Sequence, residues 1–345
     1  MVVSVLVCAL AVWAWPPTSA MAEPVKAPTR AAAIVMETSS GRVLYDDNAH
    51  TSMPMASTTK ILTAITVLRH TDPSRLVTVD AAAVGVEGSS IYLKAGERWR
   101  ILDLLYGLML RSGNDAAVQL AIATAGSVEA FAALMNDVAV RAGAFHSHFV
   151  NPHGLHHPEH YTTAYDLACI TAYAMGDPLF ARIVSTRSYT FTIGKERRTF
   201  VNKNKMLAGY EGAIGVKTGY TKVAGRCLVT AAERGGMRLI CVVLHEYDMW
   251  YRSADLLDAA FNNYRMTPLW QAGEARTVRY LGEPTPVTVR TTAYYPLCEQ
   301  EARRLTWTFS LLGKPATDAC LGEAFATLDG RIIHSAKVYS ALRSA

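Results

Sequence analysis

The sequence predicts a mixed α/β (α+β) fold in which helices flank one antiparallel sheet and a small all-β domain follows. Apolar runs separated by glycine-containing turns lie near both ends of residues 31–264, whereas the part between them is mostly helical in character. After Met266 the chain changes to short β-rich runs with Gly and Pro between them. We therefore expect the two ends of the first domain to close one sheet around an inserted helical lobe.

The first 22 residues are predicted to be a secretory signal peptide. They contain no Asp, Glu, Lys or Arg, run apolar from Val2 to Trp15, and end in Ala20-Met-Ala22. The apolar run is shorter than the roughly 20 residues that a membrane-spanning helix needs. We expect cleavage after Ala22 and a mature protein outside the cytoplasm, either in the periplasm or at the outer face of the cytoplasmic membrane.

Residues 23–266 are predicted to form the larger domain. One hairpin is expected near its start and a second near its end, and the second is followed by a helix. Two further helices between the hairpins are apolar enough to be buried. The hairpin strands are expected at residues 31–36 with 43–45 and 228–232 with 239–244, and the helices at 61–68, 101–110 and 250–264.

Residues 267–345 are predicted to form the small all-β domain. Four apolar residues alternate with Thr and Ser between Leu305 and Leu311, as in a half-buried strand. A second strand is expected at 323–328, before a turn at Asp329-Gly330. We see no amphipathic helix before Ala345, so we expect no C-terminal membrane anchor, and only peripheral contact with a membrane is left open.

Composition and charge restrict the classes of partner. Half of the 345 residues are apolar and 18% are charged, which suits a globular chain with buried cores. The 34 basic and 29 acidic residues leave a net charge of +5 that is spread along the chain. Without a run of Lys and Arg, we do not expect a nucleic-acid partner.

The cysteines outside the predicted signal peptide are five, an odd number, so at least one thiol should be free. Cys298 and Cys320 could pair within the small domain, and Cys169 fits a small buried apolar residue. No Cys-x-x-Cys pattern indicates a metal or redox site. The five are Cys169, Cys227, Cys241, Cys298 and Cys320.

Six histidines crowd into residues 146–160, which raises the question of a zinc site. They contain no His-Glu-x-x-His pair, and the segment is rich in Pro, Gly and Asn. We therefore expect no metal and no other cofactor. Asp166, three residues after Thr163, fits a helix N-terminal capping box better than a catalytic acid. The six are His146, His148, His153, His156, His157 and His160.

A candidate nucleophile lies at the start of the helix expected at 61–68. Ser57 and Lys60 are three residues apart, a spacing that puts both on one helix face. A serine hydroxyl needs a base to take its proton, and a lysine can do so when burial or a nearby cation lowers its pKa. Alone, the pattern fits equally well a capping serine beside a solvated lysine.

Two further polar triplets follow along the chain. Ser112-Gly-Asn114 comes after an apolar run, where a hydroxyl and an amide could relay a proton and hold a substrate carbonyl. Lys217-Thr218-Gly219 precedes the second hairpin on an expected edge strand, where Lys could bind a free carboxylate and Gly lets a substrate backbone approach. Each triplet alone also fits an ordinary helix cap or polar edge strand.

The order of the three patterns is more specific than any one of them. They begin 55 and 105 residues apart, behind a predicted signal peptide. Here the chain resembles the penicillin-recognising serine enzymes. Within them it is most similar to the low-molecular-mass penicillin-binding proteins of the D-Ala-D-Ala carboxypeptidase family, over roughly residues 28–264. The segments that carry this resemblance are 108–117, 151–155, 161–166, 202–205 and 215–220.

This resemblance implies a β-lactamase/DD-peptidase-like sheet, a small C-terminal β domain and a role for each residue. Ser57 would be acylated by peptidoglycan stem peptides, or by β-lactams as inhibitors, and Lys60 would accept its proton. Ser112 and Asn114 would relay the proton and position the substrate. Lys217 and Thr218 would bind the terminal carboxylate beside Gly219, and the backbone N–H groups of Ser57 and Tyr220 would form the oxyanion hole.

Three other functions share these patterns. A class A β-lactamase should add Glu-x-x-Leu-Asn between the second and third patterns, and none of the four candidate glutamates begins it. A DD-endopeptidase would use the same chemistry on a longer leaving group. A sensor or scaffold that is acylated without turnover usually adds transmembrane helices, which we do not see. The four glutamates are Glu129, Glu159, Glu196 and Glu211.

Overall fold

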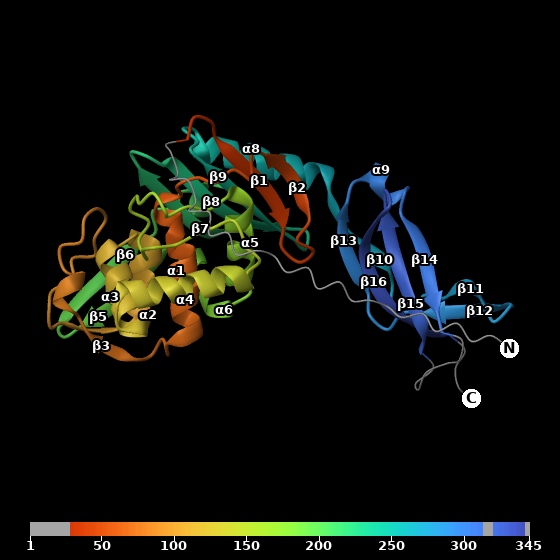
Figure 1. Ribbon diagram of the computed structural model, residues 1–345, viewed down its shortest axis with the longest axis horizontal. Coiled ribbons are helices and arrows are strands. Elements are labelled where there is room, and N and C mark those ends of the chain that lie inside the picture. Colours follow the sequence, from red (N-terminus) through yellow and green to blue (C-terminus); the bar gives the residue numbers. More distant parts are fainter. Residues whose placement is uncertain (1–27, 313–319, 342–345) are drawn as a thin grey trace, which may run out of the picture.

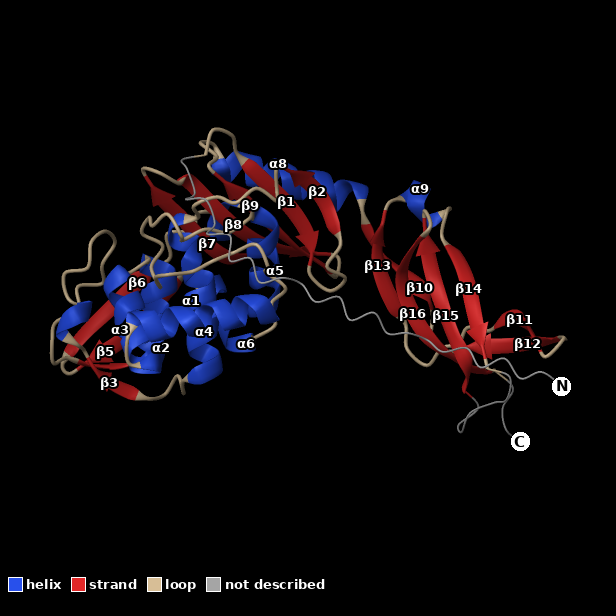
Figure 2. Ribbon diagram, in the orientation of Figure 1, coloured by secondary structure: helices blue, strands red, loops and turns tan. Residues whose placement is uncertain are grey.

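The computed structural model describes residues 28–312 and 320–341 (Figure 1). A helix-rich body with one large sheet comes first along the chain, and a body of strands follows it (Figure 2). The mixed fold class is therefore confirmed. The predicted signal peptide lies outside the described residues.

The large sheet joins the two hairpins that the sequence predicts. Its strands are antiparallel, and the first hairpin pairs directly with the second, with Ile34 opposite Val242. The two ends of this part of the chain thus close one sheet, as predicted. The order is β2 (Val43–Asp47), β1 (Ala32–Glu37), β9 (Met237–Leu244), β8 (Gly225–Arg234) and β7 (Ala213–Thr221).

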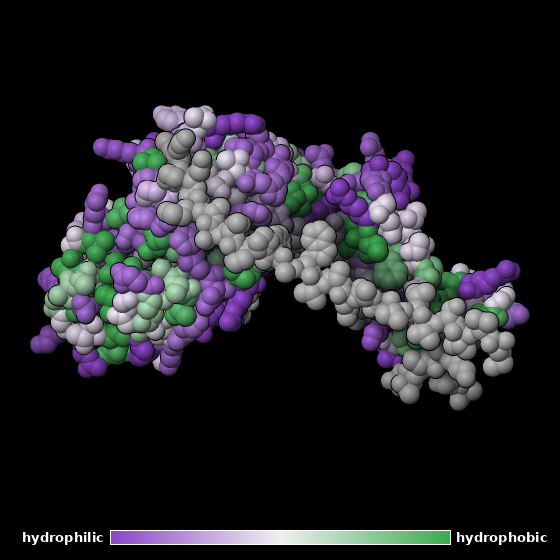
Figure 3. Space-filling model, in the orientation of Figure 1, coloured by the Kyte–Doolittle hydropathy of each residue, from purple (hydrophilic) through white to green (hydrophobic). Residues whose placement is uncertain are grey.

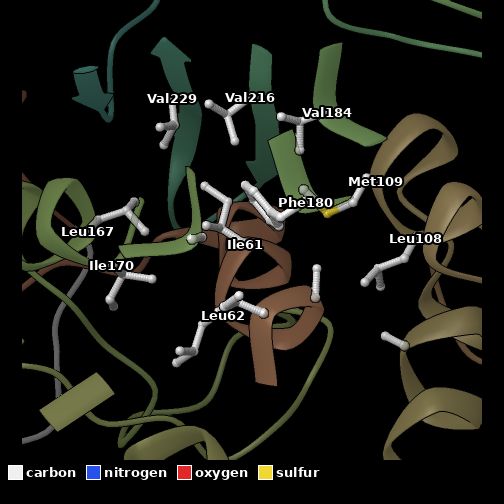
Figure 4. Packing of buried hydrophobic residues seen from close by; sticks show 14 of the residues in the cluster. Ile61, Leu62, Leu108, Met109, Leu167, Ile170, Phe180, Val184, Val216 and Val229 are labelled. Carbon is white, nitrogen blue, oxygen red and sulfur yellow. The ribbon is translucent and has the colours of Figure 1, made fainter. Parts of the chain in front are cut away.

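Helices cover both faces of this sheet because its strands are apolar on both. Ile34 and Val242 face α1 (Lys60–His70) and α5 (Ala164–Met175), whereas their neighbours face α8 (Met249–Asn263). Figure 4 shows Ile61 and Leu62 of α1 among side chains from the sheet and from α5. Helix α1 is therefore buried from Lys60 to Val67, and the sheet fixes where it begins.

The helical lobe is built on α2 (Ile101–Tyr106), α3 (Asn114–Ala125), α4 (Val128–Arg141) and α6 (Pro178–Ser185). A π-helical turn at Gly107–Arg111 continues α2 to the end of the predicted helix. Figure 3 shows hydrophobic and hydrophilic residues interspersed on the face of this lobe that is in view. The shorter helical elements are η1 (Ala56–Thr59), η2 (Ala81–Ala83) and α7 (Met206–Gly209).

The expectation of a mostly helical middle missed two small hairpins. One pairs β3 (Leu76–Thr78) with β4 (Arg98–Arg100), and the other pairs β5 (Ser188–Ile193) with β6 (Glu196–Val201). Phe191 packs against both Phe200 and Trp99, with ring centroids 4.9 and 5.4 Å apart. The second hairpin is therefore held by an aromatic cluster that joins segments far apart in the sequence.

The second body has hydrophobic clusters of its own and strands where they were predicted. Trp307 and Phe309 are partly buried while Thr306 and Thr308 are exposed, which confirms the alternating strand. The first of these strands begins at Arg265. The elements are β10 (Arg265–Trp270), β11 (Arg276–Tyr280), β12 (Glu283–Thr288), β13 (Ala293–Leu297), α9 (Glu299–Ala302), β14 (Thr306–Leu311), β15 (Cys320–Leu328) and β16 (Arg331–Ser340).

Arg42 connects the two bodies. Its guanidinium, in the turn between β1 and β2, pairs with Glu301 of α9 and donates to the carbonyl of Pro296. It also lies 5.2 Å from the ring centroids of Tyr264 and Tyr295. The side chains of Arg42 and Glu301 are only 14% and 13% exposed, so water screens this ion pair little.

The possible disulfide between Cys298 and Cys320 is not formed. All five described cysteines are free. Cys298 lies between β13 and α9, whereas Cys320 begins β15, which belongs to the five-stranded sheet of this body. Cys169 is only partly buried, less than predicted.

Among the described residues, no one helix has both the length and the apolar character needed to cross a bilayer. By those two measures alone, the bent pairs α3–α4 and α5–α6 would qualify.

Candidate active site

Ser57 lies in the short 3-10 turn η1, directly before α1. Lys60 is the first residue of α1, and its Nζ lies 2.9 Å from Ser57 Oγ. The residue before the serine, Ala56, has a left-handed φ of 49°. The spacing of three residues thus brings hydroxyl and amine together, and a strained backbone directs the serine out of the helix start.

Lys60 is completely buried, and three acceptors surround its amine. Besides Ser57 Oγ, Nζ lies 2.7 Å from Asn114 Oδ1 and 2.5 Å from the carbonyl oxygen of His153. Burial, and next the charge of Lys217, lower the pKa of Lys60 well below its ordinary value. The neutral amine is therefore favoured at this position.

The neighbours of a neutral Lys60 also decide how it is oriented. Asn114 Oδ1 and the His153 carbonyl can only accept hydrogen bonds, so they take the two N–H groups of the amine. Asn114 Oδ1 is identified as the oxygen because Asn114 Nδ2 donates to the carbonyl of Glu87 at 2.5 Å. The lone pair of Lys60 is then left for Ser57, the one neighbour of the three that can donate a proton.

The second triplet lies where the π-helical turn ends and α3 begins. Ser112 terminates the turn with φ 64°, and Asn114 is the first residue of α3. The backbone N–H of Asn114 donates to the carbonyl of Ser89 at 2.7 Å. The local break between two helices therefore lets the Asn114 amide reach Lys60, and Ser112 lines the same cavity as Ser57.

The third triplet lies on β7, which pairs on one side with β8 and has no partner strand on the other among the described residues. A Cβ added to Gly219 would lie 3.0 Å from the carbonyl oxygen of Met55 and 3.1 Å from the backbone nitrogen of Ser57. The glycine therefore allows this edge to pack directly against η1, the turn that carries Ser57. Tyr220, the next residue, is 65% exposed.

Lys217 supplies positive charge beside the edge. Its side chain is 2% exposed, and its amine donates to the carbonyl of Thr218 at 2.8 Å. Burial, and next the charge of Lys203, lower the pKa of Lys217 to about 7. This lysine is thus partly charged near neutral pH, and a bound carboxylate would favour its charged form.

A cavity of about 420 Å³ opens at this edge. No acidic side chain lines it among the described residues, whereas Lys203 and Arg226 both do. All eight residues predicted from the sequence lie in its wall or directly behind it. The lining residues are Ser57, Ser89, Ser112, Lys203, Thr218, Gly219, Tyr220, Arg226, Met249 and Trp250.

The sequence prediction missed several contributors to the site. The carbonyl of His153 holds the Lys60 amine, and Gly154 packs so tightly that an added Cβ would lie 1.9 Å from the carbonyl oxygen of Ala56. Backbone groups carry no residue-type signal, so only the segment 151–155 could point to them. Arg226 and Trp250 lie outside every motif and reach the cavity through the pairing of β8 and the start of α8.

The histidine-rich segment serves the site structurally. Among the described residues, no group of three or more His, Cys, Asp or Glu is placed to hold a metal ion. His160 is buried, accepts from the Val150 N–H and lies 2.8 Å from Thr59 Oγ1. Burial, and next the nearby histidines, lower its pKa to about 3, so it is neutral and its Nε2–H donates to Thr59.

One half of the capping box predicted at Thr163 and Asp166 is formed. The backbone N–H of Asp166 donates to the side chain of Thr163, the residue that caps α5. Its carboxylate is buried and accepts from the backbone N–H of His146 and the hydroxyl of Ser147. The aspartate therefore ties the histidine-rich segment to α5 and does not face the cavity.

Comparison with known proteins agrees with this geometry. Residues 18–247 match the sequence profile of the D-alanyl-D-alanine carboxypeptidase family. D-alanyl-D-alanine carboxypeptidase DacF of Bacillus subtilis is 33% identical over 70% of this chain and 64% of its own length. DacB2 of Mycobacterium tuberculosis is 36% identical over 66% of this chain and 81% of its own length. The chain thus spans less than two thirds of the Bacillus relative.

A solved structure is similar over a longer part of the chain. Penicillin binding protein 5 from Haemophilus influenzae superposes with a TM-score of 0.75 at 27% sequence identity. The match covers 95% of this chain and 98% of that one, so it includes the second body of strands. From its profile match, its relatives and its fold, the chain belongs to the D-alanyl-D-alanine carboxypeptidase family.

Proposed function

We propose that the chain is a serine-type D-Ala-D-Ala carboxypeptidase that removes the terminal D-alanine from peptidoglycan stem pentapeptides through an acyl-enzyme on Ser57. The observation that carries this proposal is the buried Lys60 amine, 2.9 Å from Ser57 Oγ and held by two obligatory acceptors. It supplies a neutral base aimed at the serine, as nucleophilic catalysis requires.

Substrate recognition would use the free edge of β7. Lys217 and Thr218 would bind the terminal carboxylate, and Gly219 lets the peptide lie close to η1. The backbone N–H groups of Ser57 and Tyr220 would donate to the carbonyl oxygen that becomes negatively charged. The scissile carbonyl would then lie directly over Ser57 Oγ.

Acylation transfers one proton in a closed sequence. As Ser57 Oγ attacks the carbonyl carbon, its proton moves to the lone pair of Lys60 and the carbonyl becomes an oxyanion. When the C–N bond breaks, Lys60 returns this proton through the Ser112 hydroxyl to the leaving amine of D-alanine. Asn114 holds Lys60 throughout. Water then attacks the ester carbonyl and gives one proton to Lys60. As the bond between the acyl carbon and Ser57 Oγ breaks, Lys60 passes this proton to Ser57 Oγ, so the shortened peptide leaves with a free carboxyl group and both residues return to their starting states.

On this proposal the protein would act outside the cytoplasm, where peptidoglycan is found. The proposal also explains why β-lactams would act as inhibitors, since they present a reactive carbonyl and a carboxylate to the same groups. The acyl-enzyme from a β-lactam should persist, because the chain has no Glu-x-x-Leu-Asn motif to supply the deacylating carboxylate of class A β-lactamases.

The test is release of D-alanine from a pentapeptide stem by the wild type, by Ser57→Ala and by Lys60→Ala. We expect release by the wild type, none by Ser57→Ala, and a loss of at least 100-fold in Lys60→Ala. Mass spectrometry should show a benzylpenicillin adduct on the peptide that contains Ser57. A folded wild type that releases no D-alanine would refute the proposal, and faster cleavage of crosslinked muropeptides would favour a DD-endopeptidase.

A further inference from the structure

The cavity at the free edge of β7 has more positive charge than a single carboxylate needs. Lys203 and Arg226 line it in addition to the lysine of the third triplet behind its wall, and no acidic side chain lines it among the described residues. On the proposed function, Lys217 and Thr218 bind the carboxylate at the end of the peptide. Arg226 is then available for a second anionic group.

Register and strand geometry place Arg226 on one side of this edge. It is paired with Tyr220 across the two strands, two residues before Leu228, which packs on the α8 face. Since side chains alternate along a strand, Tyr220 and Arg226 also face that side. Met249 and Trp250 at the start of α8 line the same cavity, whereas Ser57 lies against the other side of β7, at Gly219.

Arg226 is supported but carries no ion pair. Its guanidinium lies over the ring of Tyr247, 5.2 Å from the centroid, which orients the side chain without neutralising its charge. Along the described part of the chain, no carboxylate lies within 4 Å of it. An oriented guanidinium in a cavity without acidic groups is suited to bind a carboxylate by two parallel hydrogen bonds.

We propose that Arg226, with Tyr247 and Trp250, forms a subsite for a second carboxylate on the acyl side of the scissile bond. The inference rests on the proposed function. The leaving D-alanine has one carboxylate and a methyl side chain, so any further anionic group must belong to the part of the peptide that acylates Ser57. The residue before D-Ala-D-Ala is the nearest that can carry one, and a diamino acid with a second carboxylate meets this requirement.

The experiment compares two substrates that differ in one charge. Both are acylated Xaa-D-Ala-D-Ala peptides, in which Xaa is diaminopimelic acid with its side-chain carboxylate either free or amidated. We expect the wild type to prefer the free carboxylate by about tenfold in kcat/KM, as one charge-assisted contact at a partly solvated site allows. Arg226→Gln should reduce this ratio to about one.

Lys222→Gln is the matched control, because Lys222 is an exposed cation in the same β7–β8 connection that does not line the cavity. It should keep the wild-type ratio. A wild type that releases D-alanine equally from both peptides would overturn the subsite and leave the proposed function standing. The subsite would also be overturned if Lys203→Gln lost the preference for the free carboxylate in kcat/KM while Arg226→Gln kept it.

A binding measurement keeps the subsite testable if no D-alanine is released. Each peptide is then used to slow the labelling of Ser57 by a fluorescent penicillin. Stronger protection by the free carboxylate in the wild type, lost in Arg226→Gln, would support the subsite without turnover. Equal protection by both peptides would reject it.

Discussion

Lys60 and Lys217 are both buried, but the proposed mechanism needs them in opposite charge states. Lys60 must be neutral to accept a proton, whereas Lys217 must be charged to bind a carboxylate. Burial lowers the pKa of both lysines, but Lys60 also feels the charge of Lys217, which lowers its pKa further, and its amine is held by acceptors. The two lysines together thus favour one positive charge, and this charge lies on Lys217 of the edge strand β7.

This separation predicts a bell-shaped dependence of kcat/KM on pH. Activity should rise with pH as Lys60 loses its proton, and fall above about pH 7 as Lys217 loses the charge that binds the substrate. In Lys217→Arg, the falling limb should move to higher pH, because a guanidinium stays charged throughout this range. Initial rates of D-alanine release at low substrate concentration measure both limbs. A falling limb unchanged in Lys217→Arg would show that another group titrates there.

At the scale of elements, the site forms where three backbone segments of the chain pack against one another. The turn η1, which carries Ser57, is held between the edge strand β7 and the segment 151–155. Glycines occur on both sides, Gly219 on the strand and Gly154 on the segment. Both are needed because the backbone of η1 fills the space that a side chain would occupy.

Gly154→Ala should therefore damage both stability and acylation. The new Cβ would lie 1.9 Å from the Ala56 carbonyl oxygen, so η1 must move with Ser57. Gly143→Ala is the control, because Gly143 has a similar φ of +81° and no atom within 4 Å of an added Cβ. We expect about 1–2 kcal/mol of destabilisation in the control, and about 1–3 kcal/mol more in Gly154→Ala.

Urea unfolding and the rate of penicillin acylation measure these two effects. The control should be acylated at nearly the wild-type rate, whereas Gly154→Ala should be acylated at least tenfold more slowly. Equal losses in the two variants would mean that the close packing on Ala56 is unimportant.

The elements that the sequence predicted well are those with strong local patterns. The hairpins around Gly41 and Gly235 combine apolar runs with turn residues, and α1 and α8 have apolar residues at helical spacing over several turns. The β5–β6 hairpin was missed although Tyr189, Phe191 and Ile193 alternate with Ser and Thr, the same local strand pattern that predicted residues 305–311. The hairpin is held by Phe191, which packs on Phe200 within the hairpin and on Trp99 outside it, and the contact with Trp99 is one that no local pattern contains.

The same distinction between local patterns and long-range contacts applies to the site. Side chains with distinctive chemistry at short spacing, such as Ser57 and Lys60, could be predicted, and the order of the three triplets brought in the rest. The His153 carbonyl and the cavity position of Arg226 could not be, because they depend on how a loop folds back and on which residues two strands pair.

At the scale of the whole molecule, every residue of the proposed site precedes the second body. The catalytic groups end at Tyr220, and the last cavity residue is Trp250 in α8. The two bodies have separate hydrophobic clusters and are tied by Arg42, Glu301 and their tyrosine neighbours. The division into residues 23–266 and 267–345 thus predicts that chemistry needs only the first.

A chain that ends after Tyr264, before β10 begins, should release D-alanine from a soluble pentapeptide at a rate close to that of the full chain. Arg42 would lose Glu301 but gain solvent, so its charge would not be left buried and unpaired. Circular dichroism checks that the shortened chain folds. Full-length Glu301→Gln is the matched control for loss of the ion pair alone. A folded but inactive shortened chain would show that the second body contributes to the site.

The free thiols bear on how this protein is made and handled. Cys227 and Cys241 lie inside the large sheet, where burial raises the pKa of both to about 12, so neither is a ready nucleophile for thiol exchange. With the described cysteines all unpaired, the fold depends on no covalent cross-link between them. Pairing of these five cysteines is therefore not needed for folding, and a reducing buffer can protect the protein during purification without breaking a bond between them.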